Sequence, residues 1–274
     1  MEGWENAMEQ PTRAIVRAIV LAVTALFLLP LQAQAERDWE FSAGVFGGKA
    51  YHSNQDLKIN SGDNGDPFHG TVHGVQLNDS GTVGGKLTAW YLPKKYNWQP
   101  QVGFELDFTR FTADLHPQTQ GADGTVTTPG MQLGSVEFFA IRDLSVNTLA
   151  ANILFRYPIW STPDLPQGRI APYVGFGVGA QRAVLSLQVI PYREVDYAPA
   201  RQVLVGMKFF VMKNLAVFGE YKRIWSSHDF TYSGSGVTPP GYEETWSVVT
   251  NVLVGGVSLH FQEVTEGAMP CGAY

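Results

Sequence analysis

Residues 206–222 read GMKFFVMKNLAVFGEYK, and two alternating runs flank the pair Lys213-Asn214 within this stretch. Apolar side chains take every second position in both runs. Glycine or a charged residue, such as Lys208 or Glu220, often takes the positions between them. Alternation with a period of two is typical of β-strands, and a short polar break between two such runs predicts a hairpin. The stretch therefore predicts two antiparallel strands with one apolar face and one mixed face.

The same alternation recurs along most of the chain, and no segment shows a convincing long helical period. Residues 134–145 are ambiguous between the two patterns. We expect eight strands, at residues 37–48, 81–92, 99–111, 146–157, 170–184, 199–212, 214–227 and 245–261.

Composition narrows the class of protein. The formal net charge of −6 argues against nucleic-acid binding, which usually needs a basic surface. The single cysteine, Cys271, excludes a disulfide framework and cysteine-based zinc sites. With 29 Gly, 7 Trp, 11 Tyr and 16 Phe, and only 16% charged residues, the chain favours strands and turns.

The N-terminus has the features of a secretory signal. Arg13 and Arg17 precede an apolar run at residues 18–29, and Ala33-Gln34-Ala35 forms a small-x-small cleavage site. We therefore expect residues 1–35 to be a signal peptide that is cleaved near Ala35, and the protein to be exported.

Periodicity alone does not decide whether the apolar faces of the strands point inward or outward. The export signal and the aromatic residues favour outward, because two aromatic girdles around an apolar band are typical of a transmembrane barrel. A periplasmic β-sandwich is the alternative. One expected girdle contains Trp39, Tyr91, Trp98, Tyr157, Trp160, Phe209, Phe210 and Phe261. The other contains Phe108, Phe111, Tyr221, Trp225 and Trp246.

The connections between the expected strands alternate in length, as in transmembrane barrels with short periplasmic turns and long external loops. An even strand number then closes the sheet with both termini in the periplasm, giving a barrel over residues 36–261 and a short tail over 262–274. The short connections are 93–98, 158–169 and 213–214, and the long ones are 49–80, 112–145, 185–198 and 228–244.

With the apolar faces outward, charged residues point into the barrel. An eight-stranded barrel is just wide enough for side chains to fill it, so we expect an ion network rather than an open pore. Either Glu220→Ala or Lys222→Ala should lower thermal stability without opening a conductance. The expected network pairs Glu40, Glu105, Asp107 and Glu220 with Lys86, Arg156, Lys208 and Lys222.

Residues 37–261 resemble the OmpA-like family of eight-stranded outer-membrane β-barrels. The resemblance rests on the Gly206–Lys222 stretch, on APYVGFGVGA from Ala171 to Ala180, and on LVGGVSLHF from Leu253 to Phe261. It implies a scaffold and not an activity. Members commonly finish at the closing aromatic residue, whereas here 13 residues follow Phe261.

The neighbourhood of this family includes lipid A deacylases, which use a His-x-Ser-type dyad and a carboxylate at the outer rim. Ser226 and His228 are the nearest candidates, because residues two apart on a strand point the same way. A catalytic serine needs a base within reach and a group that orients the base. The order here is reversed, and the only candidate carboxylates are Asp229, Glu243 and Glu244. We therefore expect no enzymatic activity.

Other polar constellations are weaker. His69 and His73 lie among glycines and are expected to be loop histidines. The acidic residues at 63–66 lack a calcium-binding loop pattern, so we expect no metal and no cofactor. His260 is expected in the lumen, and Tyr242 belongs to a last loop whose composition suits contact with a partner or lipid.

The sequence thus predicts an all-β protein: an eight-stranded antiparallel up-and-down transmembrane β-barrel in the outer membrane of a Gram-negative bacterium. We expect a monomer with a filled lumen and a structural or surface-contact role through its long extracellular loops. Membrane lipid and lipopolysaccharide are the expected neighbours. The alternatives are a lipid A-modifying acyl hydrolase and a narrow pore.

Overall fold

The computed structural model describes residues 39–60, 68–92, 99–126, 135–138, 142–162, 165, 167–187, 192–232 and 242–261. Its secondary structure is all-β, and the described part of the chain contains no helix that is long and apolar enough to span a membrane. The expected signal peptide, the tail after Phe261, residues 63–66, Trp98 and Cys271 lie outside the described residues.

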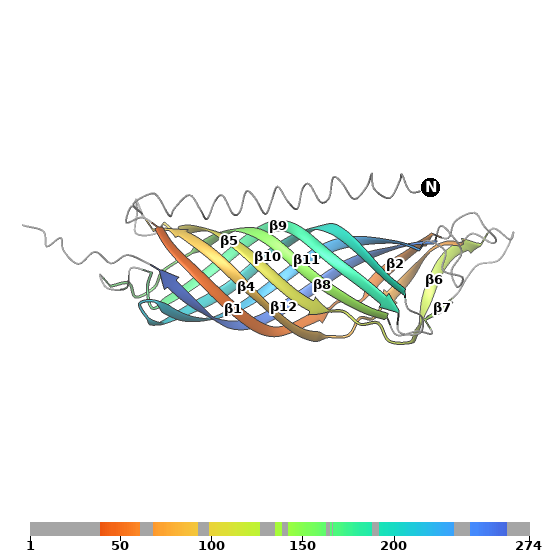
Figure 1. The fold of residues 1–274 in the computed structure, drawn as a ribbon, viewed down its shortest axis with the longest axis horizontal. Helices are drawn as coiled ribbons and strands as arrows, with labels where there is room; N and C mark the ends of the chain where they lie inside the picture. The colour runs from red at the N-terminus through yellow and green to blue at the C-terminus, as the bar shows by residue number, and fades with distance from the viewer. Residues whose placement is uncertain are drawn as a thin grey trace, which may run out of the picture.

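Eight antiparallel strands form a closed barrel (Figure 1). Each strand pairs with its neighbours in the ring, and the ring closes where β1 pairs with β12 from Phe41↔Phe261 to His52↔Thr250. The predicted eight-stranded barrel is confirmed. Its strands are β1 (Trp39–His52), β4 (Ser80–Tyr91), β5 (Gln101–Thr112), β8 (Arg142–Arg156), β9 (Ile170–Leu187), β10 (Tyr192–Met212), β11 (Leu215–Tyr232) and β12 (Tyr242–Phe261).

The last four strands are longer than expected at one end of the barrel. We call this the far end, and we call the opposite end, where Trp39 and Phe261 lie, the terminal end. The β9–β10 ladder continues out to Leu187↔Tyr192, and the β11–β12 ladder to Tyr232↔Tyr242. Most residues assigned to the loops 185–198 and 228–244 are therefore strand, because backbone pairing continues beyond the region of clear apolar alternation.

The two longest expected loops contain four further strands: β2 (Gln55–Asn60), β3 (Phe68–Val75), β6 (Gln118–Val126) and β7 (Ser135–Phe138). They extend the barrel sheet at the far end in the order β12-β2-β3-β6-β7 (Figure 1). Strand β2 pairs with Glu243–Trp246 of β12, beyond the point where β1 stops pairing at Thr250. We call these four strands the far-end extension.

Outward-facing side chains on the barrel strands are mostly apolar and exposed. On β10, for example, Val203, Val205, Met207 and Phe209 are all between 40% and 50% exposed. We call this zone the apolar belt, represented by Val45, Val83, Leu87, Phe104, Phe108, Val174, Phe176, Val178, Val203, Val205, Met207, Leu253 and Val257.

The interior of the far end is an apolar core. Leu57 and Val72 of the extension pack there with Phe230 and other buried side chains of the barrel. Three aromatic residues that were expected in the girdles are buried instead, two of them in this core. Trp246 is only 2% exposed and donates its indole N–H to Glu244, Phe111 lies in the same core, and Phe210 is buried at the terminal end. Their positions near strand ends suggested lipid contact, but they have the inward parity of their strands.

Candidate functional site

The most distinctive site is the polar interior of the barrel. All eight charged residues expected there are between 0% and 3% exposed. They divide into a central cluster of Lys86, Glu105, Asp107, Glu220 and Lys222, and a terminal cluster of Glu40 and Arg156, with Lys208 between the two.

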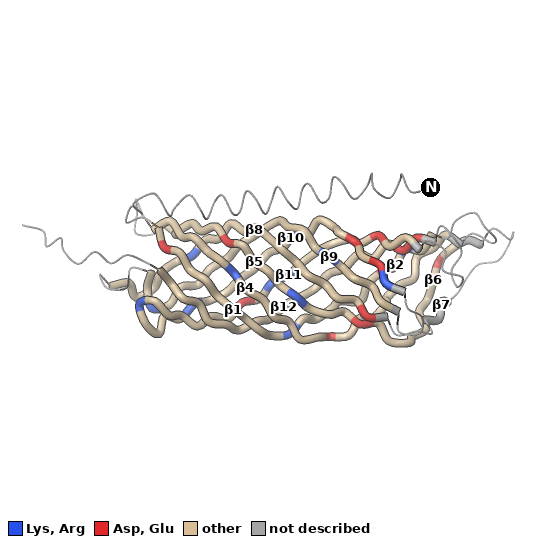
Figure 2. Tube along the Cα trace, viewed as in Figure 1, with Lys and Arg blue, Asp and Glu red and all other residues tan. Residues whose placement is uncertain are grey.

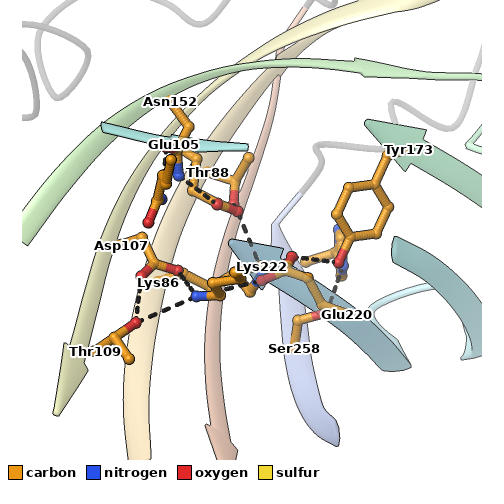
Figure 3. Close-up of polar contacts among 12 residues, drawn as sticks. Lys86, Thr88, Glu105, Asp107, Thr109, Asn152, Tyr173, Glu220, Lys222 and Ser258 are labelled. Carbon is orange, nitrogen blue, oxygen red and sulfur yellow. Dashed lines mark hydrogen bonds and ion pairs between the residues drawn. The ribbon is translucent and has the colours of Figure 1, made fainter. Parts of the chain in front are cut away.

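Glu220 links the two lysines of the central cluster (Figure 3). Lys86 Nζ donates to Glu220 Oε2 at 2.5 Å and lies 3.6 Å from Glu105 Oε2. Lys222 forms an ion pair with Asp107, and its Nζ is 3.3 Å from Glu220 Oε1. These residues come from β4, β5 and β11, so the cluster connects strands that are not adjacent in the ring.

Neutral side chains donate further hydrogen bonds to the three carboxylates (Figure 3). The Tyr173 hydroxyl donates to Glu220 Oε2 at 2.7 Å, and the Thr109 hydroxyl donates to Asp107 Oδ1 at 2.7 Å. Thr88 and Asn152 donate to the two oxygens of Glu105, each at 3.1 Å. Buried charges need such partners, because desolvation otherwise outweighs their mutual attraction. These residues were not expected at the site, although they share the inward parity of the charged ones.

Two phenylalanine rings lie against the lysines of the central cluster. Lys222 Nζ is 4.1 Å from the centroid of the Phe46 ring, and Lys86 Nζ is 4.5 Å from that of Phe218. Both distances fall within the range of cation–π attraction. The two rings also belong to the apolar core of the far end, so the central cluster lies directly beneath that core.

The terminal cluster centres on a two-pronged ion pair. Arg156 donates to both carboxylate oxygens of Glu40, at 2.8 and 2.6 Å, and its Nε donates to Gln101 at 2.7 Å. The Arg156 guanidinium also lies 4.4 Å from the centroid of the Trp90 ring. His260 Nδ1 is 2.6 Å from Glu40 Oε1, so this histidine lies in the lumen. Paired hydrogen bonds of this kind fix geometry more tightly than a single contact does.

Lys208 differs from the other seven residues. Its ammonium is buried and forms no hydrogen bond or ion pair with any described residue. It lies 5.7 Å from the centroid of the Trp90 ring and 5.9 Å from that of Tyr173, rings that also contact Arg156 and Lys86. Direct pairing was expected for Lys208, and the structure gives it ring contacts instead.

Ser226 and His228 do not bond to each other. Both contact the side-chain oxygen of Gln181: the Ser226 hydroxyl donates to it at 2.5 Å, and His228 Nε2 lies 2.8 Å from it. On the other side of the ring, His228 Nδ1 is 2.9 Å from Asp196 Oδ2. A carboxylate is therefore present, but it comes from β10 and is none of the three that the sequence suggested.

This arrangement differs from a nucleophile with its base. A catalytic hydroxyl must pass its proton to the base, whereas here the hydroxyl of Ser226 points to an amide oxygen. Gln181 also donates to Thr148 at 2.8 Å, so the group is a chain of contacts across β8, β9, β10 and β11.

Acidic side chains bridge β10 and β11 beyond the last pair of their ladder, Ala200↔Ser226. Asp196 accepts a hydrogen bond from the backbone N–H of Asp229 at 3.2 Å, and Glu194 accepts one from that of Thr231 at 2.9 Å. These bonds pair backbone N–H groups that the β10–β11 ladder no longer pairs, so the bridging gives Asp196 a structural role.

The expected girdle residues divide between the surface and the interior. Trp39, Tyr91, Tyr157, Phe209 and Phe261 are exposed at the terminal end, and the rings of Trp39 and Tyr91 are 5.2 Å apart. Tyr221 is exposed on β11, where its hydroxyl donates to Asn251 at 2.7 Å. Trp225 is half-buried beside two arginines, whereas Trp246 lies inside the core.

The remaining histidine candidates belong to a strand rather than a loop. His69 and His73 both lie on β3, and the ring of His73 is 3.4 Å from Asp56 and 3.3 Å from Asp123. Among the described residues, no group of three or more His, Cys, Asp or Glu side chains has the arrangement of a metal site.

No family model and no curated protein matches this chain, so its membership of the OmpA-like family stays a prediction. Among solved structures, Neisserial surface protein A is 15% identical with a TM-score of 0.42, covering 81% of this chain and 97% of that one. OprG of Pseudomonas aeruginosa is 14% identical with a TM-score of 0.41, covering 81% and 96%. Ail of Yersinia pestis is 14% identical with a TM-score of 0.34, covering 80% and 98%. These likenesses are too weak to carry a function from those proteins to this chain.

Proposed function

We propose that this chain is an outer-membrane β-barrel protein of a Gram-negative bacterium. The observation that carries the proposal is the distribution of side chains across the barrel wall. Val205 and Phe104 face outward and are about half exposed, while Glu220 and Lys222 face inward and are buried. A barrel in water would place these groups the other way round, whereas a bilayer requires an apolar outside and no open sheet edge.

The far end is assigned to the cell exterior. Strand β10 meets β11 at the terminal end in the short turn Lys213-Asn214, and the far end carries the far-end extension. Bacterial barrels have short periplasmic turns and longer external segments. The extension, formed by β2, β3, β6 and β7, then projects from the outer leaflet.

The role supported best is structural and surface contact, without catalysis. The interior residues Arg156 and Glu40 join strands on different sides of the barrel, and the central cluster joins three more. Crossing contacts of this kind suit a filled lumen more than an open pore. The far-end extension offers the surface for contact, and outer-membrane lipid and lipopolysaccharide are the proposed neighbours.

Site-directed labelling tests location and orientation together. In a Cys271→Ser background, Thr231→Cys places a thiol at the far end and Asn214→Cys places one in the terminal turn. We expect an impermeant maleimide to label the first variant in intact cells and the second only after the outer membrane is permeabilised. Labelling of both in intact cells, or recovery of the protein in the soluble fraction, would overturn the proposal.

Catalysis is tested by the mass of lipid A from cells that express the wild type or Ser226→Ala/His228→Ala. We expect identical lipid A, because the Ser226 hydroxyl bonds to Gln181 rather than to His228. Loss of an acyl chain with the wild type but not with the double variant would make the protein a hydrolase.

A further inference from the structure

A band of basic side chains borders the apolar belt on its far side. On seven barrel strands, the outward-facing positions lead from the belt toward the far end. The first charged or amide side chain in that direction is basic on five of these strands and asparagine on two. A carboxylate takes none of these positions, and the eighth strand, β4, has no charged or amide residue on its outward face. We call this band the cationic rim, and it consists of Lys49, Arg110, Arg182, Arg201 and Arg223, with Asn147 and Asn251 between them.

The strand register makes several members of the rim direct neighbours. Asn147 pairs with Arg110 on one side and with Arg182 on the other. Arg223 pairs with Asn251 on β12. Because cross-strand partners project from the same face of a sheet, these side chains lie side by side on the outer surface.

The rim is densest around Trp225. The guanidinium of Arg201 lies 5.9 Å from the centroid of the Trp225 ring, and that of Arg223 lies 5.3 Å from it. Both arginines are exposed, and neither forms an ion pair with a described carboxylate. Arg182, on the adjacent β9, donates to the Tyr197 hydroxyl at 3.2 Å and likewise has no carboxylate partner in the described part of the chain. By contrast, Lys49 is already paired with Asp79 at 3.1 Å.

Given the proposed membrane orientation, on which this inference rests, we propose that Arg201 and Arg223 bind the phosphate groups of lipids in the outer leaflet. On the same outer face, Val178 of β9 pairs with Arg201, and Val203 is the next outward residue of β10 toward the belt, so exposed apolar side chains lie beside the arginines and acyl chains can pack against them. Guanidinium groups bind phosphate through paired, charge-assisted hydrogen bonds. Trp225 holds two of them at the boundary between apolar and polar surface, where tryptophan is favoured.

The surrounding charge favours a lipid over a soluble anionic polymer. Beyond the rim, the described far end carries more acidic than basic residues (Figure 2). Asp229 is exposed on β11, and Glu194 and Asp196 bridge β10 and β11, whereas Arg193 is the basic residue exposed on β10. A polyanion approaching from solution would meet this negative surface first. A phosphate at the membrane interface reaches the arginines from the side.

The test uses the full barrel folded into neutral phosphatidylcholine vesicles that contain a small fraction of diphosphorylated lipid A. Lipid A retained by each barrel is counted by native mass spectrometry. We expect Arg201→Gln/Arg223→Gln to weaken retention about tenfold, the factor that corresponds to about 1.4 kcal/mol. The control variant, Arg169→Gln/Arg193→Gln, removes the same charge outside the rim and should retain lipid A like the wild type.

A second arm replaces the ligand with dephosphorylated lipid A that carries the same acyl chains. Weak retention of this lipid by the wild type would support phosphate recognition. Equal retention of both lipids, or equal loss in both double variants, would overturn the inference. Failure of the wild type to insert into any vesicle would instead overturn the proposed membrane location, so the two failures are distinguishable.

Discussion

At the scale of single residues, the interior balances its charge over the whole lumen rather than pair by pair. The central cluster holds three carboxylates, Glu105, Asp107 and Glu220, against the ammonium groups of Lys86 and Lys222. Lys208 has no direct partner among the described residues and supplies the third positive charge from its place between the central and terminal clusters. Coulomb attraction falls slowly with distance in a poorly polarisable interior, so the Lys208 ammonium still attracts these carboxylates without touching them.

The most connected residue of this network is Glu220, which contacts Lys86, Lys222 and Tyr173. We expect Glu220→Gln to lower the free energy of unfolding by roughly 3 kcal/mol, because it leaves two buried ammonium groups short of negative charge. Urea unfolding in vesicles, followed by tryptophan fluorescence, measures the loss. Glu243→Gln makes the same change at an exposed position on β12 and should leave the midpoint unchanged. Equal midpoints for both variants would contradict a stabilising network.

At the scale of strands, the alternating pattern predicted which face each side chain takes better than it predicted which residue it contacts. Alternation along residues 199–212 and 214–227 was enough to place Lys208, Glu220 and Lys222 on the inward face. It could not predict that Lys86 would meet Glu220, 134 residues away, or that Arg156 would meet Glu40, 116 residues away. Those contacts depend on how far the strands are staggered around the ring, and the sequence of a single strand does not determine this stagger.

The far-end extension was missed for a related reason. Its strands are short, and β3 mixes histidine and glycine with its apolar residues, so the alternation is weak. Pairing of β2 with Glu243–Trp246 of β12 is what makes these residues strand. The Trp246 ring then turns into the core, although its place near the end of β12 resembled that of a girdle residue.

Glycine positions inside the barrel make room for large rings on neighbouring strands. At Gly206 of β10, an added Cβ would lie 2.4 Å from Cζ of Tyr173, and the Tyr173 hydroxyl is held by Glu220. We expect Gly206→Ala to lower the free energy of unfolding by about 1–3 kcal/mol, because the ring cannot move without losing its hydrogen bond. Gly219→Ala on β11 is the matched control, since nothing lies within 4 Å of its added Cβ. Chemical denaturation of both variants measures the difference, and an equal effect would rule out the tight contact.

At the scale of the whole molecule, the barrel is asymmetric along its axis. Aromatic side chains such as Trp39 and Tyr91 border the apolar belt at the terminal end, and the cationic rim borders it at the far end. The far-end extension then adds a covered apolar core beyond the rim. An asymmetry of this kind suits a bilayer whose two leaflets differ in charge.

The membrane location of the belt can be tested at Val205. This residue faces outward on β10, and the outward residues on either side of it along the strand, Val203 and Met207, are also apolar. In a bilayer, Val205→Arg should cost about 2–4 kcal/mol, because an arginine near the membrane midplane loses its hydration. We therefore expect a smaller folded fraction in vesicles, measured by the heat-dependent mobility shift of the barrel on gels. Thr231→Arg adds the same charge to an exposed position on β11 beyond the rim and should fold like the wild type. A barrel whose outside faces water would tolerate both substitutions equally, so unimpaired folding of Val205→Arg would remove the basis for placing the belt in a membrane.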